Sequence, residues 1–152
     1  MIRFDDVLLM NAEAQIQSVG GNLNTALAEI NLVRQRASQS TALLKKSDGT
    51  FPSNYKIDIY KPGVNISWTK DSALVALQWE RRMEFAMESP RFFDLVRWGV
   101  AAETLNAFFA IEKTRHSFLS SAKFTKNTHE YFPIPQEQIT FTNGLYLQNN
   151  GY

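Results

Sequence analysis

Two helix-like segments near the N-terminus, joined by a short glycine-containing connection, constrain the fold most strongly. In residues 3–19, apolar side chains recur every three or four positions, as on one face of a helix. Residues 23–37 carry a second stripe of the same period, and Asn22 is placed to cap its start. Because so short a connection turns the chain back on itself, the sequence predicts an antiparallel helical hairpin over residues 1–38.

Three further helices are expected in residues 69–112, over 71–88, 91–98 and 101–112. Thr69 or Asp71 caps the first of them. Pro90 suits the first turn of the second, which Gly99 ends. The first helix has apolar residues around most of its circumference, which is typical of a buried helix. Four aromatic residues of these helices are therefore expected in the core: Trp79, Phe92, Phe93 and Trp98.

Two long stretches lack a helical pattern. Residues 39–68 form a loop insertion rich in turn-forming residues, yet it carries several aromatic side chains, which argue against disorder. A loop of this length is uncommon in a compact domain unless it has a function. Residues 113–152 are expected to be mostly irregular. The sequence as a whole predicts a single all-α domain over residues 1–152, with helical hairpins and long ordered loops.

The composition excludes several classes of protein. Sixteen basic and fifteen acidic residues give a net charge of +1, which argues against a nucleic-acid-binding protein. Cysteine is absent, and His116 and His129 lie in loop-like sequence with no carboxylate motif, so we expect no disulfide, metal or cofactor. No apolar run reaches the roughly 20 residues of a membrane-spanning helix. Residues 1–6 lack a signal-peptide pattern, so either the protein stays in the cytoplasm or its export segment lies outside this chain.

Three glutamates spaced by four residues, Glu80, Glu84 and Glu88, line one edge of the expected third helix. Like charges at this spacing repel and burial adds a desolvation cost, so cations must face them. The available partners are Arg81, Arg82, Arg91 and Arg97. One interpretation is a carboxylate pair for acid–base chemistry, as in a glycosidase. Carboxylates one turn apart point the same way, however, and arginines lower a carboxyl pKa, which is wrong for a general acid.

We favour a structural ion-pair network that locks two helices across the break at Ser89 and Pro90. Such networks perturb carboxylates as active sites do, and arginine suits bidentate pairing with them. The expected members are Glu80, Arg81, Glu84, Glu88, Arg91, Asp94 and Arg97. On this interpretation the chain has no catalytic residue.

Four motifs, in order along the chain, resemble those of the SusD/RagB family. They are IRFDDVLLMNAEA at 2–14, ALAEINLVRQRA at 26–37, WERRMEFAME with RFFDLVRWG at 79–99, and FPIPQEQI with a closing NNGY at 132–152. The resemblance covers nearly all of the chain except residues 39–68, and corresponds to the C-terminal part of a longer family protein. Ser89-Pro90 replaces the usual glycine and its neighbour, and Asn150 stands where a proline is common.

The resemblance implies a surface lipoprotein of the outer membrane in Bacteroidetes-type bacteria. Such proteins bind glycans or other nutrients, do not cleave them, and pass them to a TonB-dependent transporter barrel. Contact with the membrane is then expected only through a lipid anchor that this chain does not contain. The implied fold is all-α, with helix pairs that resemble tetratricopeptide repeats.

Sugar binding needs an aromatic face for the apolar side of the ring and polar groups for its hydroxyls. In the loop insertion, Tyr55, Tyr60 and Trp68 are the candidate glycan-binding residues. The alternative is that these aromatic side chains pack the loop onto the helices. A second functional interpretation also stays open, in which the chain is a tetratricopeptide-type helical adaptor that binds a peptide or protein partner.

Overall fold

The computed structural model describes residues 2–152, and within that range it is helical and contains no strand, which confirms the all-α prediction. The α-helices in this range are α1 (Phe4–Gln17), α2 (Leu23–Gln39), α3 (Lys70–Glu84), α4 (Pro90–Arg97), α5 (Ala101–Glu112) and α6 (Gln136–Phe141). Two short 3₁₀ helices accompany them, η1 (Thr41–Leu44) and η2 (Ser117–Leu119). The chain divides into two compact units, residues 1–88 and 89–152, and each is described by itself.

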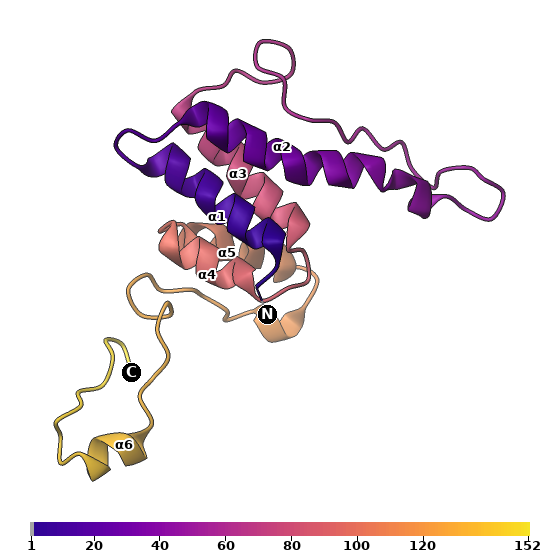
Figure 1. Cartoon of the computed structure of the whole chain (residues 1–152). Helices are drawn as coiled ribbons and strands as arrows, with labels where there is room; N and C mark the ends of the chain where they lie inside the picture. The colour runs from indigo at the N-terminus through magenta and orange to yellow at the C-terminus, as the bar shows by residue number, and fades with distance from the viewer. Residues whose placement is uncertain (1) are drawn as a thin grey trace. The chain divides into compact units, whose positions relative to one another are not determined.

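In the first unit, α1 and α2 form the expected antiparallel hairpin, and α3 packs against both helices (Figure 1). Asn22 caps α2 as predicted, because its side-chain oxygen accepts hydrogen bonds from the backbone N–H groups of Asn24 at 2.9 Å and Thr25 at 3.3 Å. Gly21 lies so close to the backbone of Gln15 that a Cβ atom there would overlap the Gln15 carbonyl. The connection between the two helices therefore needs a glycine at this position.

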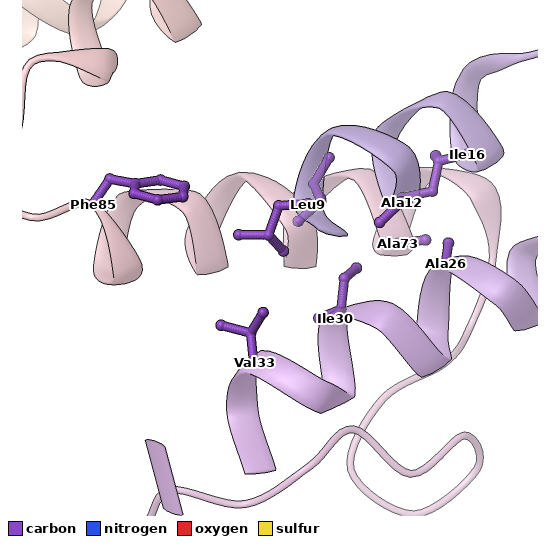
Figure 2. Close-up of a cluster of buried hydrophobic side chains, with 9 residues drawn as sticks. Leu9, Ala12, Ile16, Ala26, Ile30, Val33, Ala73 and Phe85 are labelled. Atoms are coloured by element: carbon purple, nitrogen blue, oxygen red, sulfur yellow. The ribbon is translucent and has the colours of Figure 1, made fainter. Parts of the chain in front are cut away.

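The core of the first unit lies where α1, α2 and α3 meet (Figure 2). Leu9, Ile16, Ile30 and Leu77 are fully buried or nearly so. Buried alanines stand between these larger side chains on all three helices: Ala12, Ala26 and Ala73. Because the distance between packed helices depends on the side chains at their contact, these small residues let the helices approach closely.

Helix α3 begins where the sequence predicts but ends earlier. Thr69 and Ser72 form a capping box at its start. The helix was expected to reach Glu88, yet it ends at Glu84, because Phe85 turns into the core and Met87 adopts a left-handed φ of 66°. The side chain of Arg3 donates a hydrogen bond of 3.1 Å to the Glu84 carbonyl, which replaces an intrahelical partner.

The expectation that α3 is buried all round is wrong. Val75, Trp79 and Met83 share one exposed face of the helix, and each is 52–53% exposed. The other helices of the first unit cover only the opposite side of α3. The core assignment of Trp79 is therefore wrong, and so is that of Phe93, which is 62% exposed.

In the second unit, α4 and α5 pack together around Leu95, Ala101 and Phe124. Pro90 occupies the first turn of α4, and Gly99 follows the helix with a left-handed φ of 73°, as the sequence predicts. Phe92 and Trp98 are partly buried. Of these aromatic residues, only Phe92 packs against the core of this unit.

The C-terminal segment is irregular apart from η2 and α6, a short helix that the sequence analysis missed. Hydrogen bonds join the start of the motif at residues 132–139 to the residues at the closing NNGY. The side-chain amide of Gln148 exchanges hydrogen bonds of 2.7 and 2.9 Å with the backbone of Ile134. Asn149 donates to the carbonyl of Phe132 at 2.6 Å. Across the described part of the chain, no helix combines the length and apolar character needed to cross a bilayer.

Candidate functional site

Glu80 of α3 pairs with an arginine of α2, at the point where the loop insertion returns to the helices. Arg34 donates to the Glu80 carboxylate at 2.9 Å, and its Nε donates to the carbonyl of Asp58 at 2.7 Å. Its guanidinium also lies over the ring of Tyr60, 4.1 Å from the centroid. Arg34 thus joins two helices and the loop through a single side chain.

Burial raises the pKa of Glu80, although the hydrogen bond from Arg34 acts in the opposite direction. Arg34 lowers the pKa of Glu80 as expected, but the net shift is upward, because the carboxylate is almost entirely removed from water and desolvation disfavours its charged form. Burial also raises the pKa of the Tyr60 hydroxyl beside it.

Glu84 and Glu88 pair with arginines that the sequence analysis did not name. Arg36 of α2 donates a short hydrogen bond to the Glu84 carboxylate, and Arg3 lies 3.3 Å from it. Arg3 also pairs with Glu88 at 3.0 Å. These arginines belong to the motifs at residues 2–14 and 26–37, so three of the four motifs meet through their charged side chains.

The other expected members of the network are distributed over both units. Arg81 is buried and pairs with Asp6 at 2.9 Å. In the second unit, Arg97 contacts Asp94 through two nitrogens, at 2.9 and 3.1 Å, and the guanidinium of Arg91 lies 5.9 Å from the ring centroid of Trp98. A clamp between α3 and α4 across the break at residues 89–90 stays a prediction.

The end of the loop insertion is fastened to α2. The side-chain amide of Asn31 donates to the Tyr60 carbonyl at 2.9 Å and accepts from the Tyr60 N–H at 2.7 Å. Trp68 donates from its indole nitrogen to the carbonyl of Leu23 at 2.9 Å. The rings of Tyr60 and Trp68 lie 6.1 Å apart and pack against the core of the first unit. This part of the loop is therefore held in a fixed position.

An apolar groove of about 390 Å³ lies between the loop and the exposed face of α3. Its lining residues are Tyr60, Ile66, Asp71, Ser72, Val75, Ala76 and Trp79. The guanidinium of Arg82 lies over the Trp79 ring at 5.1 Å. The groove offers apolar contact and few polar groups for a ligand.

A second, smaller hollow of about 200 Å³ lies near the start of the loop. Its lining residues are Ser38, Thr41, Phe51, Ser53, Asn54, Tyr55 and Ile57. The rings of Phe51 and Tyr55 meet edge to face, with their centroids 5.8 Å apart. We call this the Tyr55 hollow. It places aromatic rings beside hydroxyl and amide groups, which is the combination that a sugar ring requires.

The structure does not gather the three candidate glycan-binding residues into one cavity. Tyr55 lines the Tyr55 hollow, Tyr60 lines the apolar groove, and Trp68 packs against the core. Sequence reasoning missed Trp79 as a residue that lines the apolar groove, because the pattern of α3 indicated burial on all sides. It missed the pairing of Phe51 with Tyr55, although their spacing within one turn-rich stretch was visible. Among residues 2–152, no three His, Asp or Glu side chains come together as a metal site.

Comparison with known families identifies the family to which the chain belongs. The model of the SusD family matches residues 1–152, the whole chain. No curated protein matches the sequence. Members of the SusD family are binding proteins of surface uptake systems for glycans and other nutrients, not enzymes. On its sequence motifs, its helical fold and this match, the chain belongs to the SusD family.

Proposed function

We propose that this protein captures an oligosaccharide at the outer-membrane surface and passes it to a TonB-dependent transporter. Family membership supports the general role of nutrient binding. The protein is held at the membrane by a lipid anchor, as the family resemblance implies, and it binds its cargo without cleaving it.

The Tyr55 hollow is the observation that carries the proposal for an oligosaccharide. Phe51 and Tyr55 supply apolar ring surface, and Ser53 and Asn54 supply polar groups at the same rim. Peptide-binding surfaces of helical adaptors rely instead on apolar or charged helix faces. The mixed aromatic and hydroxyl lining therefore favours a sugar over a peptide.

The scaffold supports this role because it fastens one end of the loop to α2. Asn31 and Arg34 fasten the far end of the loop to α2, while Ser38 and Thr41 contribute to the hollow from the end of α2 and from η1. A site held on a rigid scaffold loses less conformational entropy when its ligand binds. Tyr60 and Trp68 then serve to position the loop.

The charged network supports binding rather than hydrolysis. Glu80 and Glu84 lie on one helix and each accepts a hydrogen bond from an arginine of α2. A glycosidase needs two carboxylates on either side of the scissile bond, about 5–9.5 Å apart. Side chains one turn apart on the same helix do not enclose a sugar in this way.

The test is to screen the purified chain against an oligosaccharide array and to measure the affinity of each hit by calorimetry. The expected result is binding of at least one oligosaccharide class with no cleavage product by chromatography. Phe141→Ala, at an exposed aromatic residue of the second unit, is the matched control and should bind as the wild type does. Binding of peptides but of no saccharide would support the adaptor interpretation and overturn the proposal.

Delivery to a transporter is tested separately in cells. Uptake of the labelled oligosaccharide found on the array should fall when the gene is deleted and recover when it is restored. Unchanged uptake in the deletion strain would overturn the transport part of the proposal.

A further inference from the structure

The Tyr55 hollow is small and is lined without any charged side chain. Its polar side chains carry four hydroxyls and one amide, from Ser38, Thr41, Ser53, Tyr55 and Asn54. At about 200 Å³ it is smaller than the roughly 300–1,000 Å³ of sites that enclose drug-sized ligands. Its size therefore suits a single ring rather than a longer stretch of a chain.

The hydrogen bonds already made by the lining groups define what they offer to a ligand. The hydroxyls of Ser38 and Thr41 donate to backbone carbonyls, to Gln35 at 2.8 Å and to Ser38 at 3.2 Å. Their oxygens are left as acceptors. The side chains of Ser53 and Asn54 have no hydrogen-bond partner within residues 2–152, so they can both donate and accept. This set of acceptors and donors matches the hydroxyls of a sugar.

The two rings of the hollow have different surroundings. The ammonium group of Lys45 lies over the Phe51 ring, 5.4 Å from its centroid. Tyr55 has no cation over its ring among the described residues and is 37% exposed. Tyr55 is therefore the ring that is available for stacking against the apolar face of a sugar, with Phe51 packed against it at an interplanar angle of 83°.

The absence of a lining charge determines the class of sugar. Strong recognition of a carboxylate needs an arginine or lysine, and recognition of an ammonium group needs an acid. Neither is among the residues that line the hollow. We infer that the Tyr55 hollow is a subsite for one neutral sugar ring, which stacks on Tyr55 and bonds to Ser53 and Asn54. This inference rests on the proposed function and adds the ligand class to it.

The experiment is an NMR titration of the full chain with methyl glycosides of neutral hexoses, with glucuronic acid and glucosamine as charged comparisons. The neutral glycosides are expected to shift the amide resonances of residues 51–57, and the charged sugars to bind at least several-fold more weakly. Tyr55→Ala should weaken binding about tenfold, because an aromatic contact contributes up to about 1.5 kcal/mol beyond its buried area. Tyr55→Phe keeps the ring but loses the hydroxyl, so it should bind more tightly than Tyr55→Ala.

Two controls keep the test specific. Lys45→Ala removes the cation over the Phe51 ring and should leave the preference for neutral sugars unchanged. Thermal unfolding of Tyr55→Ala, which alters an exposed loop residue, should match that of the wild type.

Several results would overturn the inference. They are equal binding by Tyr55→Ala and the wild type, a preference for glucuronic acid, or shifts confined to residues around Trp79. If the chain binds an oligosaccharide on the array but Tyr55→Ala binds it equally well, the subsite is wrong and the proposed function stands. If no saccharide of any kind binds, the proposed function fails and the subsite fails with it.

Discussion

Arg34 and Glu80 join α2 to α3 through an ion pair of 2.9 Å in which the glutamate side chain is only 5% exposed. The same guanidinium holds the loop through the Asp58 carbonyl and the Tyr60 ring. Arg34 therefore contacts the candidate binding loop and both helices at once. This relationship leads to the first prediction.

Replacing Arg34 by methionine is expected to lower the free energy of unfolding by about 3 kcal/mol, because Glu80 is left buried without its partner. Urea denaturation followed by circular dichroism measures the change. Arg82→Met is the matched control, since Arg82 is exposed on the neighbouring helix, and its cost should stay below about 0.5 kcal/mol. Equal losses in the two variants would show that the Arg34–Glu80 pair has no special role.

The pH dependence of stability provides a second prediction. Burial raises the folded-state pKa of Glu80 above the ordinary glutamate value of 4.5, so between these two pKa values the folded state holds a proton that the unfolded state has released. Stability from this group is therefore fully present below pH 4.5 and is lost as pH rises through the folded pKa. Glu80→Gln cannot titrate. The difference in unfolding free energy, wild type minus Glu80→Gln, should fall as pH rises through this window.

Chemical denaturation at half-unit pH steps from 3.5 to 8 measures this difference. Asp58 titrates in the opposite sense, because the hydrogen bond from Lys61 lowers its pKa, but Asp58 is common to both proteins and cancels. A difference that rises with pH would show that Arg34 outweighs desolvation at Glu80.

Much of the helical framework could be predicted from local signals. Asn22 precedes an amphipathic stripe and caps α2, and Pro90 and Gly99 mark the two ends of α4. At each of these helix ends, the type of residue is itself the signal. The end of α3 carries no such signal. Met87, which is not a glycine, takes the left-handed conformation there, and the turn depends on the long-range bond from Arg3 to Glu84. Local patterns cannot reveal a helix end that is set by tertiary contacts.

The attachment of the loop provides a third prediction. Asn31→Ala removes both hydrogen bonds between α2 and the Tyr60 backbone and is expected to cost about 1–3 kcal/mol. Hydrogen exchange measured by mass spectrometry should show faster exchange in peptides covering residues 55–65. Asn24→Ala, at an exposed position on the same helix, should leave these peptides unchanged. Slow exchange in Asn31→Ala would mean that the other contacts of the loop are sufficient.

The candidate site was only partly predictable, for a related reason. The sequence identified Tyr55 by residue type, but the hollow also needs Ser38 and Thr41, which the fold brings next to the loop. Likewise, the spacing of the glutamates showed that cations must face them. The partner of Glu80 is Arg34, 46 residues away, which spacing along one helix cannot indicate. The types of residue in the site could be predicted from the sequence. Their positions in space could not, because these depend on how α2 and α3 pack.

The connection between α1 and α2 provides the last prediction. Gly20 has a left-handed φ of 81° with open space where a Cβ would lie, whereas a Cβ on Gly21 would overlap the backbone of Gln15. Asparagine tolerates the left-handed region better than alanine, so Gly20→Asn should be milder than Gly20→Ala. At Gly21 both substitutions should cost about 1–3 kcal/mol, because the obstacle is backbone that cannot move aside. Thermal unfolding of the four variants distinguishes the two causes, and a mild Gly21→Ala would show that the hairpin relaxes around the added methyl group.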